Sequence, residues 1–132
     1  MVMEKLQDIF NEQVFADSLS LIWQSTFCKL PKMFRVDYAL VKGEKVVGFC
    51  EIKNREISFN DYSDTLLSLN KWEYLLYLSQ STKLPVYLAI QYLDKGTYVE
   101  IDKNLDIEIK LKTVKGDTIP YVFIKLSQFT II

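Results

Sequence analysis

The segment Phe34–Arg55, FRVDYALVKGEKVVGFCEIKNR, restricts the possible folds most, because it predicts two antiparallel strands and places charges inside them. Two runs rich in β-branched and aromatic residues flank KGEK, a sequence typical of a tight turn. Strand interiors rarely carry charge. Yet Asp37 lies in the first run, and Glu51 and Lys53 lie in the second. A fold that contains this hairpin must give three charged side chains a place beside its sheet.

Side chains alternate across a strand, so the second run of the hairpin has two distinct faces. Glu51 and Lys53 leave the same face as Phe49, whereas Cys50 and Ile52 leave the other face. An acid and a base are therefore expected side by side on one face of the sheet.

The length of the turn decides whether Asp37 joins this acid and base. A two-residue turn closed by Lys42 and Lys45 would pair Asp37 with Cys50. A three-residue turn, or an equivalent bulge, pairs it with Glu51, and we expect this second register. Two carboxylates at that separation repel each other unless a cation lies between them. A hard divalent ion such as Mg²⁺ or Mn²⁺ suits such oxygen ligands.

The segments on either side of the hairpin predict an α/β domain. Helical spacing of apolar residues predicts a first helix from Val2 to about Leu21. A second helix is predicted over Tyr62–Ser81, with Asn60 or Asp61 as its cap. Besides the hairpin, strands are predicted at STFCKL, LPVYLAIQYL, YVEIDK, DIEIKLK and YVFIKL. The expected order is helix, two or three strands, helix, strand and a β-rich tail.

The whole chain is interpreted as one domain, residues 1–132, with a core at about 3–92 and a β-rich C-terminal extension at about 97–132. Its 132 residues are 49% apolar, which is enough to bury one core. The N-terminus has no basic segment followed by a purely apolar stretch, so neither a signal peptide nor a membrane span is expected. The alternating tail strands either extend the sheet or pair between two copies in a homodimer.

The composition removes several classes of chemistry. Histidine is absent, which excludes Ser-His-Asp and Cys-His catalysis and any histidine-ligated zinc site. Cys28 and Cys50 are too few for a structural zinc site, and we interpret them as free thiols in a reducing cytoplasm. The 16 Lys and Arg nearly balance the 17 Asp and Glu, which argues against a protein that coats DNA without sequence preference. Carboxylates, lysine and a hard metal ion remain as catalytic groups.

The hairpin motif resembles that of a known family. Asp37, followed after thirteen residues by Glu51-Ile52-Lys53, is similar to the D…(D/E)-x-K signature of the PD-(D/E)XK nuclease superfamily. The resemblance covers about Glu12 to Ile90 and implies the restriction-endonuclease-like fold with a mixed central sheet. RVD stands where the signature has PD. Members of the Holliday-junction-resolvase type also carry a glutamate on the first helix, followed by apolar residues three, four and seven positions on. Glu12 precedes Phe15, Ala16 and Leu19 in the same way.

The resemblance implies a role for each of these residues. Asp37, Glu51 and the Ile52 carbonyl would bind Mg²⁺ or Mn²⁺, and Glu12 would complete the metal site. Lys53 would be the catalytic base, or would offset charge in the transition state. Asp17, on the same helix, is the alternative to Glu12. Arg55 and Lys71 would contact nucleic acid.

The function implied by the resemblance is divalent-metal-dependent hydrolysis of phosphodiester bonds in nucleic acid, with DNA expected before RNA. Two other interpretations remain open. One is a catalytically inactive module of the same fold that binds or assembles. The other is an unrelated α/β domain in which Glu51 and Lys53 form an exposed cross-strand pair and Lys71 only solvates its helix.

Overall fold

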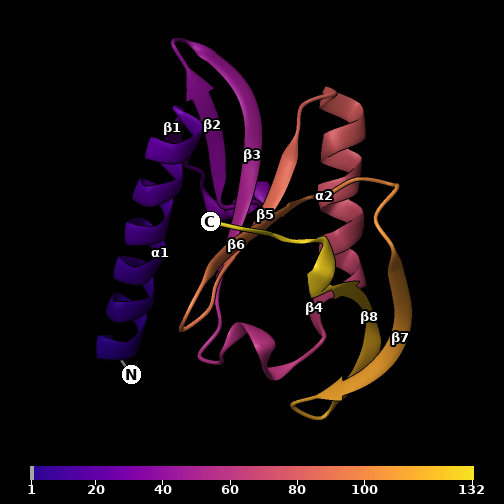
Figure 1. The fold of residues 1–132 in the computed structure, drawn as a ribbon. Coiled ribbons are helices and arrows are strands. Elements are labelled where there is room, and N and C mark those ends of the chain that lie inside the picture. The colour runs from indigo at the N-terminus through magenta and orange to yellow at the C-terminus, as the bar shows by residue number, and fades with distance from the viewer. Residues whose placement is uncertain (1) are drawn as a thin grey trace.

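The computed structural model describes residues 2–132, with side chains from residue 7 onward, so position 1 of the expected domain lies outside it. It contains two α-helices, nine strands and three short 3₁₀ helices (Figure 1). The elements are α1 (Val2–Trp23), β1 (Thr26–Lys29), η1 (Lys32–Phe34), β2 (Tyr38–Lys42), β3 (Lys45–Asn54), η2 (Phe59–Asp61), β4 (Asp64–Ser68), α2 (Leu69–Thr82), β5 (Val86–Gln91), β6 (Gly96–Glu100), β7 (Ile107–Val114), β8 (Asp117–Lys125), η3 (Leu126–Gln128) and β9 (Thr130–Ile131).

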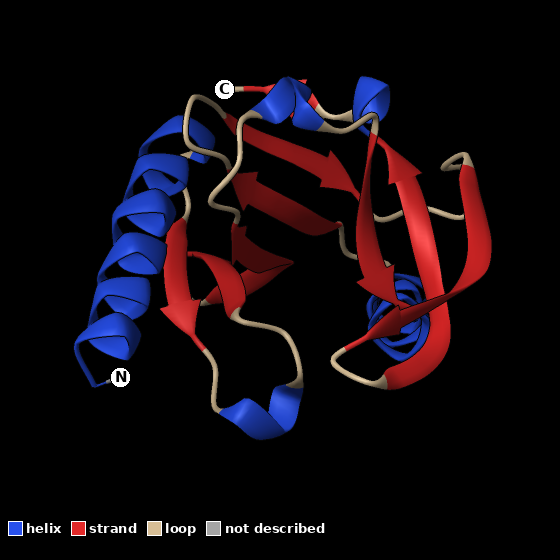
Figure 2. Ribbon diagram, turned by 90° about the horizontal axis from the view of Figure 1, so that it is seen from below, coloured by secondary structure: helices blue, strands red, loops and turns tan. Residues whose placement is uncertain are grey.

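The central sheet has six strands in the order β1-β2-β3-β5-β6-β9. Only β3 and β5 run parallel within it, so the sheet is mixed, as expected. A second sheet has the order β4-β8-β7. Figure 2 shows α1 on one side of the central sheet, and α2, seen end-on, with the second sheet on the other side.

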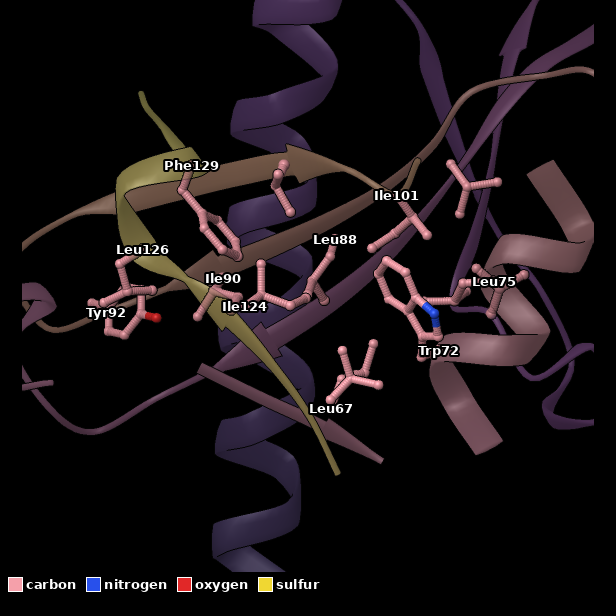
Figure 3. Close-up of a cluster of buried hydrophobic side chains, with 14 residues drawn as sticks. Leu67, Trp72, Leu75, Leu88, Ile90, Tyr92, Ile101, Ile124, Leu126 and Phe129 are labelled. Atoms are coloured by element: carbon pink, nitrogen blue, oxygen red, sulfur yellow. The ribbon is translucent and has the colours of Figure 1, made fainter. Parts of the chain in front are cut away.

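Each face of the central sheet carries its own apolar cluster. On the α1 face, Phe15 and Leu19 pack with Tyr38, Cys50 and Ile52. On the opposite face, α2 packs on strand β5 and on the β8 region, whose buried side chains are drawn in Figure 3. The residues of that cluster include Leu67, Trp72, Leu75, Leu88, Ile90, Val122, Ile124, Leu126 and Phe129. The C-terminal strands thus supply part of the apolar packing against α2.

The hairpin adopts the expected register through a bulge and not through a longer turn. Lys42 pairs with Lys45 around a two-residue turn, in which Gly43 has a φ of 63° that favours glycine. The register then shifts at the unpaired Val47. From there Tyr38 pairs with Cys50, so the next step of the ladder places Asp37 opposite Glu51. Asp37 itself precedes β2, which starts four residues later than predicted.

The expected helix over Tyr62–Ser81 is wrong in its first part. Residues 64–68 form strand β4, and α2 begins only after Ser68, whose side chain accepts a hydrogen bond from the Lys71 N–H at 3.2 Å. β4 buries Thr65 and Leu67 and pairs with β8, whose residues lie more than fifty positions away. A local pattern cannot reveal such a partner. Asp61 instead closes the capping box of η2.

Within residues 2–132, neither helix is apolar over the length that a bilayer crossing requires.

Candidate catalytic site

Asp37 lies beside β3, close to the carboxyl end of that strand. Its Oδ2 accepts a hydrogen bond from the Ile52 backbone N–H at 2.8 Å, which fixes the carboxylate against the strand. Its Oδ1 lies 3.5 Å from Lys29 Nζ. Strand β2 begins only at Tyr38, so no residue of β2 pairs with β3 beside Ile52. The Asp37 carboxylate accepts the Ile52 hydrogen bond that a backbone carbonyl of a longer β2 would accept. Asp37 is therefore held by the same strand that carries Glu51 and Lys53.

Glu51 is the most buried acid of the site, with 7% of its side chain exposed. Oε2 lies 3.1 Å from Lys71 Nζ on α2. Oε1 is buried and has no hydrogen-bond partner among the described residues. Desolvation by burial raises the pKa of Glu51, and the neighbouring charge of Asp37 raises it further, against the opposing effect of Lys71. Burial and Asp37 thus disfavour the ionised form of Glu51, even though Lys71 lies beside one of its oxygens.

Glu12 comes to the site from α1. Its Oε2 accepts hydrogen bonds from Lys29 Nζ at 2.7 Å and from the Tyr38 hydroxyl at 2.9 Å. The pKa of Lys29 is raised, because its contacts with Glu12 and Asp37 outweigh its partial desolvation. Asp17 is exposed and accepts a hydrogen bond from Gln13 at 2.9 Å. The structure therefore brings Glu12, and not Asp17, towards Asp37.

Lys53 follows Glu51 on the same face of β3 and is half-buried. Burial lowers the pKa of its ammonium, and the charge of Glu51 opposes that shift. No described residue forms a hydrogen bond or ion pair with Lys53 Nζ within the usual distances. Arg55 lies just beyond β3 and lines a pocket of about 560 Å³ with residues of α1.

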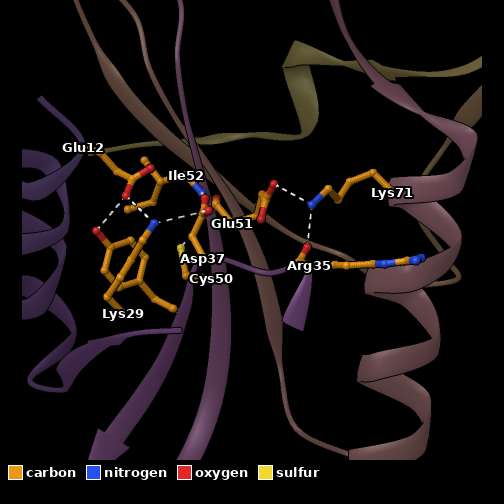
Figure 4. Close-up of polar contacts among 9 residues, drawn as sticks. Glu12, Lys29, Arg35, Asp37, Cys50, Glu51, Ile52 and Lys71 are labelled. Atoms are coloured by element: carbon orange, nitrogen blue, oxygen red, sulfur yellow. Dashed lines mark hydrogen bonds and ion pairs between the residues drawn. The ribbon is translucent and has the colours of Figure 1, made fainter. Parts of the chain in front are cut away.

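Sequence reasoning missed Lys29, the residue that joins Glu12 to Asp37. Figure 4 shows Asp37 between the Glu12–Lys29 pair and the Glu51–Lys71 pair. A weak signal was available in the sequence, because Lys29 ends the short predicted strand STFCKL. Its pairing with Tyr38 places both side chains near Glu12, but this pairing needs the fold.

The acidic side chains do not form a preformed metal-binding site. Among residues 7–132, no three acidic or cysteine side chains converge closely enough to enclose an ion. Glu12 approaches from the α1 face and Glu51 faces α2, with lysine ammonium groups beside both. These ammonium groups offset the repulsion that close carboxylates otherwise suffer. A hard divalent cation nevertheless fits the donor set, because the buried Glu51 Oε1 lacks a positive or hydrogen-bonding partner in the described structure.

Comparison with known proteins gives two matches. Residues 2–132 match the sequence profile of a family described as "Phage putative PDDEXK endonuclease". The fold is similar to that of Hjc, a Holliday junction resolvase from the archaeal hyperthermophile Archaeoglobus fulgidus. The TM-score is 0.56 at 14% sequence identity, over 89% of this chain and 85% of that chain. No curated protein sequence matches. The structural likeness confirms the fold class expected from the sequence.

Proposed function

The chain belongs to the family of phage PDDEXK endonucleases, which are nucleic-acid nucleases, and we propose that it hydrolyses DNA phosphodiester bonds at Asp37, Glu51 and Lys53 with a divalent cation. One observation carries the assignment of the site. Glu51 Oε1 is a buried carboxylate oxygen without a described partner, beside a second carboxylate. Lys71 pairs with the other oxygen, Oε2, and a buried carboxylate oxygen that lacks any partner is costly, so Oε1 favours a positive ligand.

Asp37 and Glu51 would hold the ion, with the Ile52 carbonyl and Glu12 as further oxygen donors. A bound Mg²⁺ or Mn²⁺ would supply Lewis-acid polarisation of the phosphate and a more acidic water. The protein's own contribution begins with orientation. The Ile52 N–H fixes the Asp37 carboxylate, and β3 fixes Glu51 and Lys53 on one face. Lys29 Nζ lies near both Glu12 and Asp37 and offsets part of their negative charge.

Lys53 is proposed as the proton acceptor for the attacking water, or as the group that offsets charge on the phosphate in the transition state. Its desolvated ammonium has a lowered pKa, which favours release of its proton. The group lies two residues from Glu51, so both act on the same small volume. This role needs no ligand bond between Lys53 and the cation.

The proposed substrate is DNA in the setting of recombination or repair, because the structural neighbour is a Holliday junction resolvase. At 14% identity this neighbour supports the fold and not its choice of branched DNA. We further propose a homodimer, in which the exposed edge strand β7 is available to pair. A cytoplasmic location is proposed from the two free cysteines. Analytical sedimentation of the purified chain tests the homodimer. Fractionation of phage-infected or expressing cells tests the location.

Metal choice provides the direct test of the proposed chemistry. The purified chain is expected to cut labelled linear, single-stranded or four-way-junction DNA with Mg²⁺ or Mn²⁺. With Ca²⁺ it should bind the ion but cut at least about 100-fold more slowly, because the looser coordination of Ca²⁺ positions water poorly. Gel analysis of the products also separates endonucleolytic from exonucleolytic cutting. Equal rates with Mg²⁺ and Ca²⁺ would contradict the mechanism, and no cutting of any substrate would favour the inactive binding module.

Two variants test which acidic residue of α1 belongs to the catalytic site. Glu12→Gln removes the charge that faces Lys29 and Tyr38, so we expect weaker Mn²⁺ binding and roughly tenfold slower cleavage. Asp17→Asn is the matched control, because Asp17 is exposed on the same helix and bonds only to Gln13 among the described side chains. Calorimetric Mn²⁺ titration and cleavage rates should change for the first variant alone. The reverse result would transfer the role to Asp17.

A further inference from the structure

A basic pocket adjoins the candidate catalytic site on its α2 side. We call it the α2 pocket; its volume is about 300 Å³, and it is lined by Lys32, Arg35, Ser68, Asn70, Lys71 and Tyr74. Three of these six side chains are cationic and none is acidic. Lys71 borders both places, because its Nζ lies 3.1 Å from Glu51 Oε2. An anion in the α2 pocket would thus lie next to the catalytic carboxylates.

The positive charge of the α2 pocket is mostly uncompensated. Lys71 is paired with Glu51, but Lys32 and Arg35 are exposed and form no ion pair with a described acid. Charges of one sign gathered in a concave site attract a ligand of the other sign. Guanidinium and ammonium groups are the usual partners of phosphate oxygens.

The backbone of Arg35 is held by hydrogen bonds at the edge of this pocket. Arg35 follows η1 as its C-cap residue with a φ of 56°, a conformation that costs a residue other than glycine about 1 kcal/mol. Its N–H donates to the Lys32 carbonyl, and its own carbonyl accepts a hydrogen bond from Lys71 Nζ. Figure 4 shows the Arg35 side chain extending towards α2. The same short loop therefore positions both Lys32 and Arg35 over the first turn of the helix.

We infer that the α2 pocket binds a backbone phosphate of the DNA strand that is cut, next to the phosphate that reacts. Lys32 and Arg35 contact the phosphate oxygens, while Tyr74 and Asn70 offer an aromatic edge and an amide to the adjoining sugar or base. The inference rests on the proposed function, since it places the ligand relative to Glu51. A phosphodiester is favoured over an acidic peptide because one continuous strand can fill this pocket and reach the carboxylates together.

The test compares Lys32→Ala and Arg35→Gly with Lys45→Ala. Glycine suits the positive φ of residue 35, so Arg35→Gly removes the guanidinium without straining the loop. Lys45 is an exposed lysine at the hairpin turn and serves as the matched control. Binding is measured by fluorescence anisotropy with labelled single-stranded and duplex oligodeoxynucleotides in EDTA, from 50 to 200 mM NaCl.

Each pocket variant should weaken oligonucleotide binding about tenfold. It should also reduce by about one the steepness of the salt slope, the slope of the logarithm of the binding constant against the logarithm of the NaCl concentration, whereas Lys45→Ala should change neither quantity. In Mg²⁺, the pocket variants should raise KM about tenfold with kcat within roughly threefold of wild type. An unchanged affinity and salt slope, or an equal loss in Lys45→Ala, would overturn the inference. The inference would also be overturned if the pocket variants lost binding to a labelled oligoglutamate peptide but kept their affinity for the oligonucleotides.

The two proposals fail separately in this design. If wild type cuts no DNA but the pocket variants still lose oligonucleotide affinity, the proposed hydrolysis fails and the phosphate site stands. If wild type cuts DNA and both pocket variants bind and cut as well as wild type, the phosphate site fails and the hydrolysis stands.

Discussion

Glu51→Gln is expected to abolish Mn²⁺ binding and to slow DNA cleavage by at least about 10³-fold, while making the metal-free protein more stable. The carboxylate is almost fully buried, and one of its oxygens has no described partner. A neutral amide removes the charge that burial and Asp37 disfavour. Loss of the ion pair with Lys71 should cost little stability. Lys71 Nζ still donates a hydrogen bond to the Arg35 carbonyl, and about a quarter of its side chain is exposed to water. Calorimetry and thermal unfolding measure both effects.

The stability gain of Glu51→Gln should depend on pH in a defined direction. The folded pKa of Glu51 is raised, so ionisation of this group destabilises the folded state. That destabilisation is absent below the unfolded glutamate pKa of about 4.3 and is complete above the folded pKa. The variant should therefore gain on the order of 1 kcal/mol, or roughly 4 °C in Tm, at neutral pH in EDTA, and nothing near pH 3.

Glu73→Gln, an exposed acid on α2, is the control for both measurements and should behave as wild type. Saturating Mn²⁺ should reverse the order of stability, because the ion stabilises wild type alone. A Glu51→Gln protein that binds Mn²⁺ and cuts DNA normally would remove Glu51 from the site.

Lys53→Ala should slow cleavage by about 10²-fold or more, roughly 3 kcal/mol of transition-state stabilisation, and leave Mn²⁺ affinity nearly intact. The reason is that Lys53 acts on the water or on the phosphate and is not a metal ligand. Its loss also removes a desolvated ammonium from beside Glu51. Single-turnover cleavage and Mn²⁺ titration separate these effects, and they distinguish Lys53→Ala from Glu51→Gln, which should lose both properties.

Lys53→Arg separates the two possible roles of the lysine. Arginine keeps the positive charge but cannot release a proton near neutral pH. Substantial activity in Lys53→Arg would assign Lys53 to charge stabilisation. An activity as low as that of Lys53→Ala, together with loss in Lys53→Arg of the low-pH limb, over which the wild-type rate rises with pH, would assign it to proton transfer. Cleavage by Lys53→Ala at the wild-type rate would place Lys53 outside the chemistry.

Much of this arrangement could be predicted because it depends on local rules. Alternation along one strand placed Glu51 and Lys53 on the same face, and the need to pair Asp37 with Glu51 implied a bulge or a longer turn. The apolar spacing after Glu12 matches the buried positions Phe15, Ala16 and Leu19.

What the sequence could not give depends on distant partners. β4 was mistaken for helix because its pairing with β8 spans more than fifty residues. The link through Lys29 depends on where β1 joins the sheet beside β2. The pairing of Lys71 with Glu51 depends on how α2 docks on β5, the neighbour of β3 in the sheet. The roles of all these residues in catalysis remain predictions until the variants are measured.

The bulge at Val47 has a consequence for how the motif can change in evolution. A two-residue turn pairs positions whose numbers differ by an odd amount, whereas Asp37 and Glu51 differ by an even amount. One unpaired residue corrects this parity. A single-residue insertion or deletion in the hairpin would therefore remove the need for the bulge and leave the two acids opposite each other. The interval of thirteen residues between Asp37 and Glu51 can therefore change by one residue. A sequence search that requires this interval would miss relatives with the same site geometry.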